Sequence, residues 1–210
     1  MNAKILSLNI GDPELMAWND LSVRSSMHKR PVAGPLKVHS DRIEGNSFAS
    51  PNYHGTLDSV LYAYGMTSAL KFMSLLNQTN YAVGTTGETL TLDHFEESEV
   101  SVGDIFEVGT VTAQATYPRI PCGKLNIRLQ HPKGQRAMQE CLASGVYFRI
   151  LKPGIISSQD SVKRVEKSRH HFSILDLYKM VVYNEKLTPQ QLEVALANDA
   201  FPKRFIEKYR

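Results

Sequence analysis

A chain of 210 residues is long enough to bury one core, and its 42% hydrophobic and 21% charged residues are ordinary values for a globular protein. No apolar run approaches the roughly 18 residues of a membrane span. The net charge of +3 is too mild to indicate a nucleic-acid surface by itself and suits a small anionic ligand equally well. Residues 1–9 lack the long apolar stretch and cleavage site of a signal peptide, so we expect a cytoplasmic protein.

The first two thirds of the chain alternate short β-like runs with glycine and proline. The runs cover residues 4–10, 35–39, 59–64, 100–116 and 145–151. Short strands at this spacing predict a mainly β (α+β) fold, a barrel or a folded sheet. Two helices are expected, at 66–77 and 134–143, and helical spacing predicts that Leu70, Met73 and Leu76 form the buried face of the first.

The last third of the chain changes character after Lys152-Pro153-Gly154, which predicts a main domain over residues 1–155 and a helical extension over 156–210. Ser173 is expected to cap one helix, Thr188 to open a second through a capping box, and residues 202–208 to form a third. We expect these helices to pack as a separate small bundle or against a partner subunit. The side chains expected to be largely buried are Ile174, Leu177, Val181, Leu192 and Leu196.

Cys122 is the strongest candidate for a functional side chain. The chain has two cysteines, too few for a disulfide framework of the secreted type, although a single bridge to Cys141 stays open. Cys122 follows a β-like run, in a loop that two prolines and a glycine make rigid. Arg119 and Lys124 flank it, and nearby cations favour the thiolate, the form that binds metals or attacks electrophiles. The alternative is a buried structural cysteine, the role expected for Cys141 on its predicted helix.

Three further clusters have both a functional and an ordinary interpretation. His54 lies in a turn before a β-like run, where a histidine is more often merely exposed. The loop at 84–90 is rich in glycine and threonine and is a candidate anion nest, although such loops are common and this one lacks the P-loop and dinucleotide patterns. Lys29 and Arg30 add two cations that are either functional or part of a solvated surface.

These clusters, taken in order, resemble the MOSC domain family, named after the C-terminal domain of molybdenum cofactor sulfurase. The similarity is closest to the stand-alone, YiiM-like members, covers about the first 155 residues, and extends to a helical tail of the kind that follows in that subgroup. The matching segments are Lys29-Arg30-Pro31-Val32-Ala33-Gly34-Pro35, Glu44-Gly45, His54-Gly55, Asp58, Gly87-Glu88-Thr89-Leu90, Val102-Gly103-Asp104 and Pro118-Arg119-Ile120-Pro121-Cys122. The chain departs from the family pattern at Asn46, Thr56, Ser59 and Thr89.

The resemblance implies a β-barrel-like fold that binds the molybdenum cofactor (molybdopterin), a pterin with a dithiolene and a phosphate. It implies that Cys122 is both the molybdenum ligand and the catalytic residue, because a soft thiolate suits a sulfur-rich metal centre. It also implies reduction of small N-hydroxylated substrates, with electrons from a reductase protein, and it leaves open pyridoxal phosphate as a ligand and a homodimer. The residues expected to bind the cofactor are Lys29, Arg30, His54, Asp58, Glu88, Thr89, Arg119 and Lys124.

Two rival functions remain at this point. In the first, the protein is a non-catalytic carrier whose Cys122 holds a persulfide or the cofactor without turnover. In the second, it binds nucleic acid through a basic stripe, which Glu166 and the absence of interleaved aromatic residues argue against. The residues of that stripe are Lys163, Arg164, Lys167, Arg169 and His170.

Overall fold

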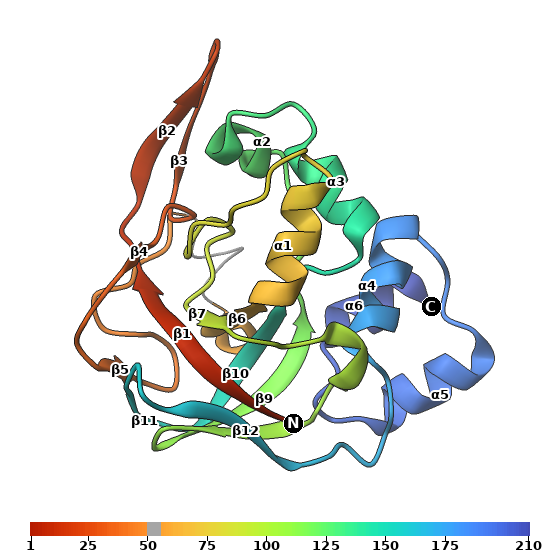
Figure 1. Ribbon diagram of the computed structural model, residues 1–210. Helices are drawn as coiled ribbons and strands as arrows, with labels where there is room; N and C mark the ends of the chain where they lie inside the picture. The colour runs from red at the N-terminus through yellow and green to blue at the C-terminus, as the bar shows by residue number, and fades with distance from the viewer. Residues whose placement is uncertain (50–55) are drawn as a thin grey trace.

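The structure is a computed structural model that describes residues 1–49 and 56–210, and a closed barrel of mixed strands forms its centre (Figure 1). Seven strands close it in the order β12-β8-β9-β10-β6-β7-β1, and β1 pairs again with β12. The pair β6–β7 is parallel and the other pairs are antiparallel. The predicted β-rich, barrel-like fold is therefore confirmed. The strands are β1 (Asn2–Ile10), β6 (Leu61–Gly65), β7 (Leu90–Leu92), β8 (Ile105–Val108), β9 (Val111–Pro118), β10 (Val146–Lys152) and β12 (Ser161–Glu166).

Five further strands of the described chain lie outside the barrel. β4 (Arg30–Pro31) pairs with the end of β1, and β5 (Leu36–Val38) pairs with β11 (Gly154–Ile156). β2 (Glu14–Trp18) and β3 (Leu21–Ser25) form a hairpin that projects from the body beside α2 (Figure 1).

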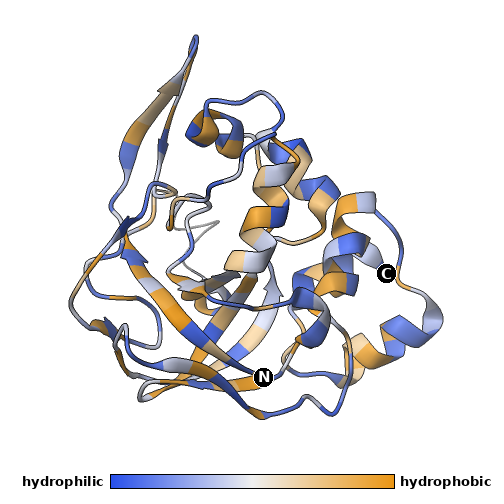
Figure 2. Ribbon diagram, viewed as in Figure 1, coloured by the Kyte–Doolittle hydropathy of each residue, from blue (hydrophilic) through white to orange (hydrophobic). Residues whose placement is uncertain are grey.

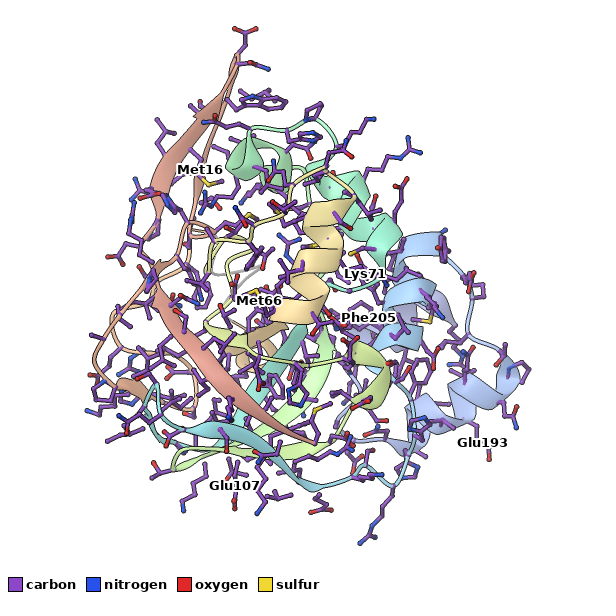
Figure 3. The ribbon with its side chains drawn as sticks, in the orientation of Figure 1. Met16, Met66, Lys71, Glu107, Glu193 and Phe205 are labelled. Carbon is purple, nitrogen blue, oxygen red and sulfur yellow. The ribbon has the colours of Figure 1, made fainter. Side chains whose placement is uncertain are left out.

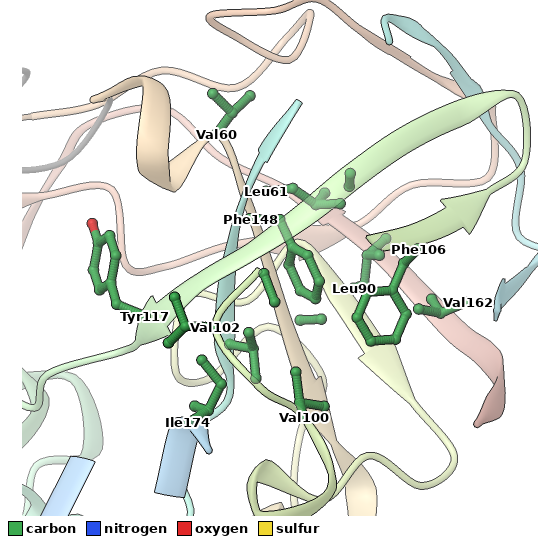
Figure 4. Close-up of a cluster of buried hydrophobic side chains, with 14 of the residues drawn as sticks. Val60, Leu61, Leu90, Val100, Val102, Phe106, Tyr117, Phe148, Val162 and Ile174 are labelled. Atoms are coloured by element: carbon green, nitrogen blue, oxygen red, sulfur yellow. The ribbon is translucent and has the colours of Figure 1, made fainter. Parts of the chain in front are cut away.

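Alternating burial along the strands builds the core. β1 shows the simplest case, because exposed and buried side chains alternate with a period of two from Asn2 to Ser7, and the next two residues are buried as well. Inside the barrel, the rings of Phe95, Phe106 and Phe148 contact one another at centroid distances of 5.5–6.2 Å. Figure 4 shows Phe106 and Phe148 side by side. Orange and blue residues alternate accordingly along the ribbon (Figure 2). Charged side chains such as Glu107 and Glu193 point outward, whereas Phe205 is buried (Figure 3).

Helices cover the outside of the barrel. α1 packs with α3 over a second cluster of buried side chains that includes Ala69, Phe72, Met73 and Leu76. Leu70 is 43% exposed, so its predicted burial is wrong. The helix face that packs on this cluster carries Ala69 and Phe72, and Leu70 lies outside that face. The helices are η1 (Leu57–Ser59), α1 (Met66–Ser74), η2 (Glu97–Glu99), α2 (Lys124–Leu129), α3 (Gly134–Cys141), α4 (Ile174–Tyr183), α5 (Pro189–Ala197) and α6 (Lys203–Tyr209).

The C-terminal helices share the core of the barrel and do not form one of their own, which corrects the expectation of a separate bundle. Ile174 and Leu177 are fully buried in the same cluster as the barrel side chains, and α4 contacts β9. Val181 and Leu192 are partly buried against that cluster. Leu196 is 59% exposed, contrary to expectation, because the short α5 fully buries only Ala195.

The helix caps predicted from the sequence are present, whereas the predicted boundary of the extension is not where the barrel ends. Ser173 accepts a hydrogen bond from the Asp176 backbone N–H, and Thr188 forms the predicted capping box with Gln191. β12 lies beyond residue 155, so the barrel includes part of the segment assigned to the extension. No helix in the described part of the chain is long and apolar enough to span a bilayer.

Candidate functional site

A pocket of about 660 Å³, including its open mouth, lies where several distant segments of the chain meet. Its walls come from the segment after β3, the start of β6, the loop before β7, the loop after β9, and β10. Lys29, Arg119, Cys122 and Lys124 all line it, although they are far apart in the sequence.

Lys29 is a buried cation at the wall of this pocket. Its side chain is 6% exposed, and Nζ donates a 2.7 Å hydrogen bond to Oγ1 of Thr89. Burial lowers the pKa of Lys29 to about 8, and the nearby Glu88 carboxylate opposes that effect. The backbone of Lys29 packs directly on Gly84, where a Cβ would lie 2.5 Å from the Lys29 carbonyl oxygen and φ is +82°. Only glycine suits that position.

Arg119 is a second buried cation, placed by the end of β9. It is 4% exposed, and its backbone N–H donates to the Gly145 carbonyl at 3.3 Å. Its guanidinium contacts thioether sulfurs, with Nη1 3.0 Å from Met138 Sδ and Nη2 3.8 Å from Met27 Sδ. Among the described residues, no carboxylate forms a salt bridge with it. A buried guanidinium without an anion is costly, and an anionic ligand would offset that cost.

The two cysteines differ as the sequence analysis expected. Cys122 is half-buried and free, and it lines the pocket together with both buried cations. Its loop leads into α2, where the Leu125 N–H donates to the Cys122 carbonyl at 3.0 Å. Cys141 is also free but is buried in the cluster between α1 and α3, away from the pocket. The single disulfide left open from the sequence is therefore not formed.

The glycine-rich loop before β7 binds the carboxylate of Glu88 within the chain. This side chain is fully buried and accepts hydrogen bonds from the backbone N–H groups of Gly84, at 2.6 Å, and Thr86, at 3.1 Å. It also accepts from the hydroxyls of Thr86 and Thr91. The interpretation of these amides as a nest for a free anion is wrong, because the protein's own carboxylate occupies them. Glu88 thus shapes the pocket wall and holds negative charge near Lys29.

Other predicted site residues lie elsewhere. Arg30 pairs with Glu14 at 2.9 Å, has a side chain 61% exposed, and does not line the pocket. Asp58, in η1, pairs with Arg149 at 2.7 Å, and neither residue lines the pocket. His54 lies outside the described residues. These positions did not converge because each of the two described ones has an ion-pair partner on another element.

Two of the five residues of the basic stripe considered for nucleic acid lie in a barrel strand. Lys163 and Arg164 lie in β12, and Arg164 forms a 3.1 Å salt bridge with the buried Asp104. A cation held in this way contributes to the packing of β12 on the barrel and is not free for a phosphate backbone.

An aromatic wall was missed from the sequence. Tyr62 and Tyr147 both line the pocket, with ring centroids 4.9 Å apart. Tyr62 donates to the Ser144 carbonyl at 2.7 Å, and burial raises the pKa of both phenols, so they stay protonated at neutral pH. The available signal was a tyrosine in each of two predicted strands, Tyr62 in the run 59–64 and Tyr147 in the run 145–151, but nothing in the sequence placed the two strands side by side.

The barrel thus gathers one accessible thiol and two buried cations, Lys29 and Arg119, in a single pocket. Residues 50–163, more than half of the chain, match the MOSC domain. The chain belongs to the MOSC domain family.

Relatives support this assignment at low identity. YflK of Bacillus subtilis (strain 168) is 26% identical over 172 residues, which cover 81% of this chain and 76% of the relative. YiiM of Escherichia coli (strain K12) is 28% identical over 145 residues, 68% of this chain and 65% of that protein. A protein of Gibberella moniliformis named "Reductase" is 26% identical over 161 residues, which span 76% of this chain but only 29% of that protein.

Solved structures agree on the fold. YiiM from Geobacillus stearothermophilus superposes with a TM-score of 0.79 at 25% identity, covering 99% of this chain and 97% of that one. YiiM from Escherichia coli gives a TM-score of 0.74 at 20% identity, covering 99% and 90%. The match includes the C-terminal helices, so barrel and extension recur together.

Proposed function

We propose that the pocket binds the molybdenum cofactor and that the protein reduces N-hydroxylated bases or related amines. The observation that carries the proposal is that Cys122 shares one pocket with Lys29 and Arg119, two buried cations. MOSC domains are associated with this cofactor, and a relative named "Reductase" supports a redox role. Electrons would come from a separate reductase protein.

The residues present fit such a group. The thiol of Cys122 offers a soft ligand suited to a sulfur-rich metal centre. Lys29, Arg119 and Lys124 offer donors and positive charge to a phosphate, and Arg119 has no carboxylate partner among the described residues.

Each of these residues has a task that follows from its position. Cys122 would hold the metal, and the cations would hold the phosphate at the inner wall. Tyr62 and Tyr147 form an apolar ring surface beside them, which excludes water from one side of the pocket. When bound, the cofactor supplies the two-electron chemistry that cleavage of an N–O bond requires.

The test uses protein purified from a host that makes the cofactor, with a chemically reduced electron donor and an N-hydroxylated purine as substrate. Formation of the aminopurine by wild type, and its loss in Cys122→Ala, is the expected result. Loaded wild-type protein that forms no product would refute the reductase and would favour the carrier function instead.

A further inference from the structure

Tyr147 is the one phenol of the pocket wall whose hydroxyl is uncommitted. Its ring lies between Tyr62 and Tyr117, with centroids 4.9 and 5.1 Å away, so its orientation is fixed. Tyr62 donates its hydroxyl hydrogen to the Ser144 carbonyl. Among the described residues, the hydroxyl of Tyr147 has no hydrogen-bond partner, although the side chain lines the pocket.

The charges around Tyr147 suit a proton donor. Burial raises the pKa of Tyr147 and the neighbouring Tyr117 adds to the rise, so the phenol keeps its proton at neutral pH. The guanidinium groups of Arg119 and Arg204 act in the opposite direction and would stabilise a phenolate that forms transiently. Arg204 comes from α6 and stacks on the Tyr117 ring, with Cζ 4.3 Å from its centroid.

Tyr147 shares the pocket with the thiol of Cys122. Arg119 and Tyr147 both interact electrostatically with Cys122, and all three line the pocket. Lys29, the other candidate donor, has its Nζ on Thr89 and interacts mainly with Glu88. Tyr147 is therefore a pocket-lining phenol with an O–H that no described residue accepts.

We propose that Tyr147 is a catalytic residue whose hydroxyl donates a proton to the oxygen of the substrate's N–O bond. This inference rests on the proposed reductase function. The N–O bond breaks and the oxygen leaves as water; the two electrons that reduce the nitrogen would be those that the cofactor, when bound, supplies from the electron-donor protein. One proton comes from Tyr147 and the second from solvent, so that a hydroxylamine, two electrons and two protons give an amine and water. Tyr147 then recovers its proton through the open mouth of the pocket.

The test compares Tyr147→Phe with Tyr117→Phe, which alters the same ring stack at a position that does not line the pocket. Both variants keep their rings, so molybdenum content and thermal midpoint should match wild type. For Tyr147→Phe we expect kcat to fall by about 10²–10³, as general acid catalysis allows. Tyr117→Phe should stay within about twofold.

Measured affinities for substrate and product distinguish a proton-donating hydroxyl from a ring with only a structural role. Wild type should bind the N-hydroxylated base more tightly than its amine product, and Tyr147→Phe should lose about three- to tenfold of that preference, the value of one hydrogen bond. If wild type is active and Tyr147→Phe is fully active too, Tyr147 is not the proton donor, and the proposed reductase function is unaffected. Loss of molybdenum from Tyr147→Phe would overturn it too, since the hydroxyl would then hold the cofactor. An inactive, loaded wild type would remove the reductase function and this inference together.

Discussion

The two cysteines occupy environments that give them different roles. Cys122 is half-buried at the pocket, whereas Cys141 is 1% exposed and its thiol donates to the carbonyls of Met138 and Ala143, each at 3.3 Å. Burial raises the pKa of Cys141 to about 11, so this thiol stays protonated and unreactive.

Replacing each cysteine with alanine should therefore affect the stability of the protein to different extents. We expect Cys141→Ala to lose about 1–2 kcal/mol of unfolding free energy, because it leaves a cavity in packed surroundings. Cys122→Ala should change stability by less than about 0.5 kcal/mol, the usual range away from the core. Denaturant unfolding under reducing conditions measures both, and an equal loss in the two variants would contradict the assignment.

Lys29 gives anion binding a pH dependence. Its pKa in the folded protein is about 8, below the ordinary 10.5, so the side chain loses its charge as pH rises through 8. Sulfate keeps its charge in this range, so we expect its affinity for the pocket to fall between pH 7 and 9. Calorimetric titration at each pH measures the affinity.

Two variants make this measurement specific. Lys29→Gln should bind sulfate weakly at every pH, whereas Lys124→Gln should weaken binding and keep the transition near pH 8. A transition near 8 that survives in Lys29→Gln would assign it to another group.

At the scale of elements, Glu97 joins three parts of the chain. It lies in η2, and its buried carboxylate accepts from the Gly145 N–H at 2.5 Å and from the Ser68 hydroxyl at 3.2 Å. Burial raises the pKa of Glu97 to about 7. The Gly145 carbonyl in turn accepts the Arg119 N–H, so this carboxylate helps to position the pocket cation.

Stability should fall as pH rises from about 4.5 to about 7. In that window the folded protein retains a proton on Glu97 that the unfolded chain has released, and each unit of separation is worth about 1.4 kcal/mol. Glu97→Gln mimics the neutral acid and should remove this slope. Urea unfolding of both proteins at pH 5 and 8 gives the comparison, and identical slopes would show that Glu97 titrates normally.

Helix caps and strands were predictable where a local sequence signal, a capping hydroxyl or an alternating pattern, decides the local structure. Ser173 and Thr188 were found from the hydroxyl that caps a helix, and β1 from its alternation. The hairpin of β2 and β3 was missed, although Asn19, with φ of 50°, is a turn signal. β12 was missed because its outward residues are charged and were interpreted as a surface stripe.

At the scale of the whole molecule, the convergence of the site could not be read from local sequence. Lys29, Arg119 and Cys122 meet because the barrel brings its loops to one place, and only the family resemblance grouped them beforehand. Arg30 and Asp58 had the same sequence signal yet pair with Glu14 and Arg149 outside the pocket. Spacing in the sequence carries no information about which carboxylate or cation a side chain meets.

The C-terminal helices should be necessary for a folded barrel. Ile174, Leu177 and Phe205 belong to the barrel core, and Phe205 contacts Tyr117 with centroids 5.7 Å apart. Ending the chain after Ser168 would expose these contacts, so we expect no cooperative thermal transition by circular dichroism. A truncated protein that melts cooperatively within a few degrees of the full chain would show that residues 1–168 fold independently.

The central claim is that one pocket, with Cys122 as metal ligand, holds the molybdenum cofactor. The most direct measurement is molybdenum and pterin per polypeptide in protein purified from a host that makes the cofactor, for wild type, Cys122→Ala and Cys141→Ala. We expect near-stoichiometric content in wild type and in folded Cys141→Ala, and loss of most of it in Cys122→Ala. Equal molybdenum in all three proteins, or none in wild type, would contradict the account.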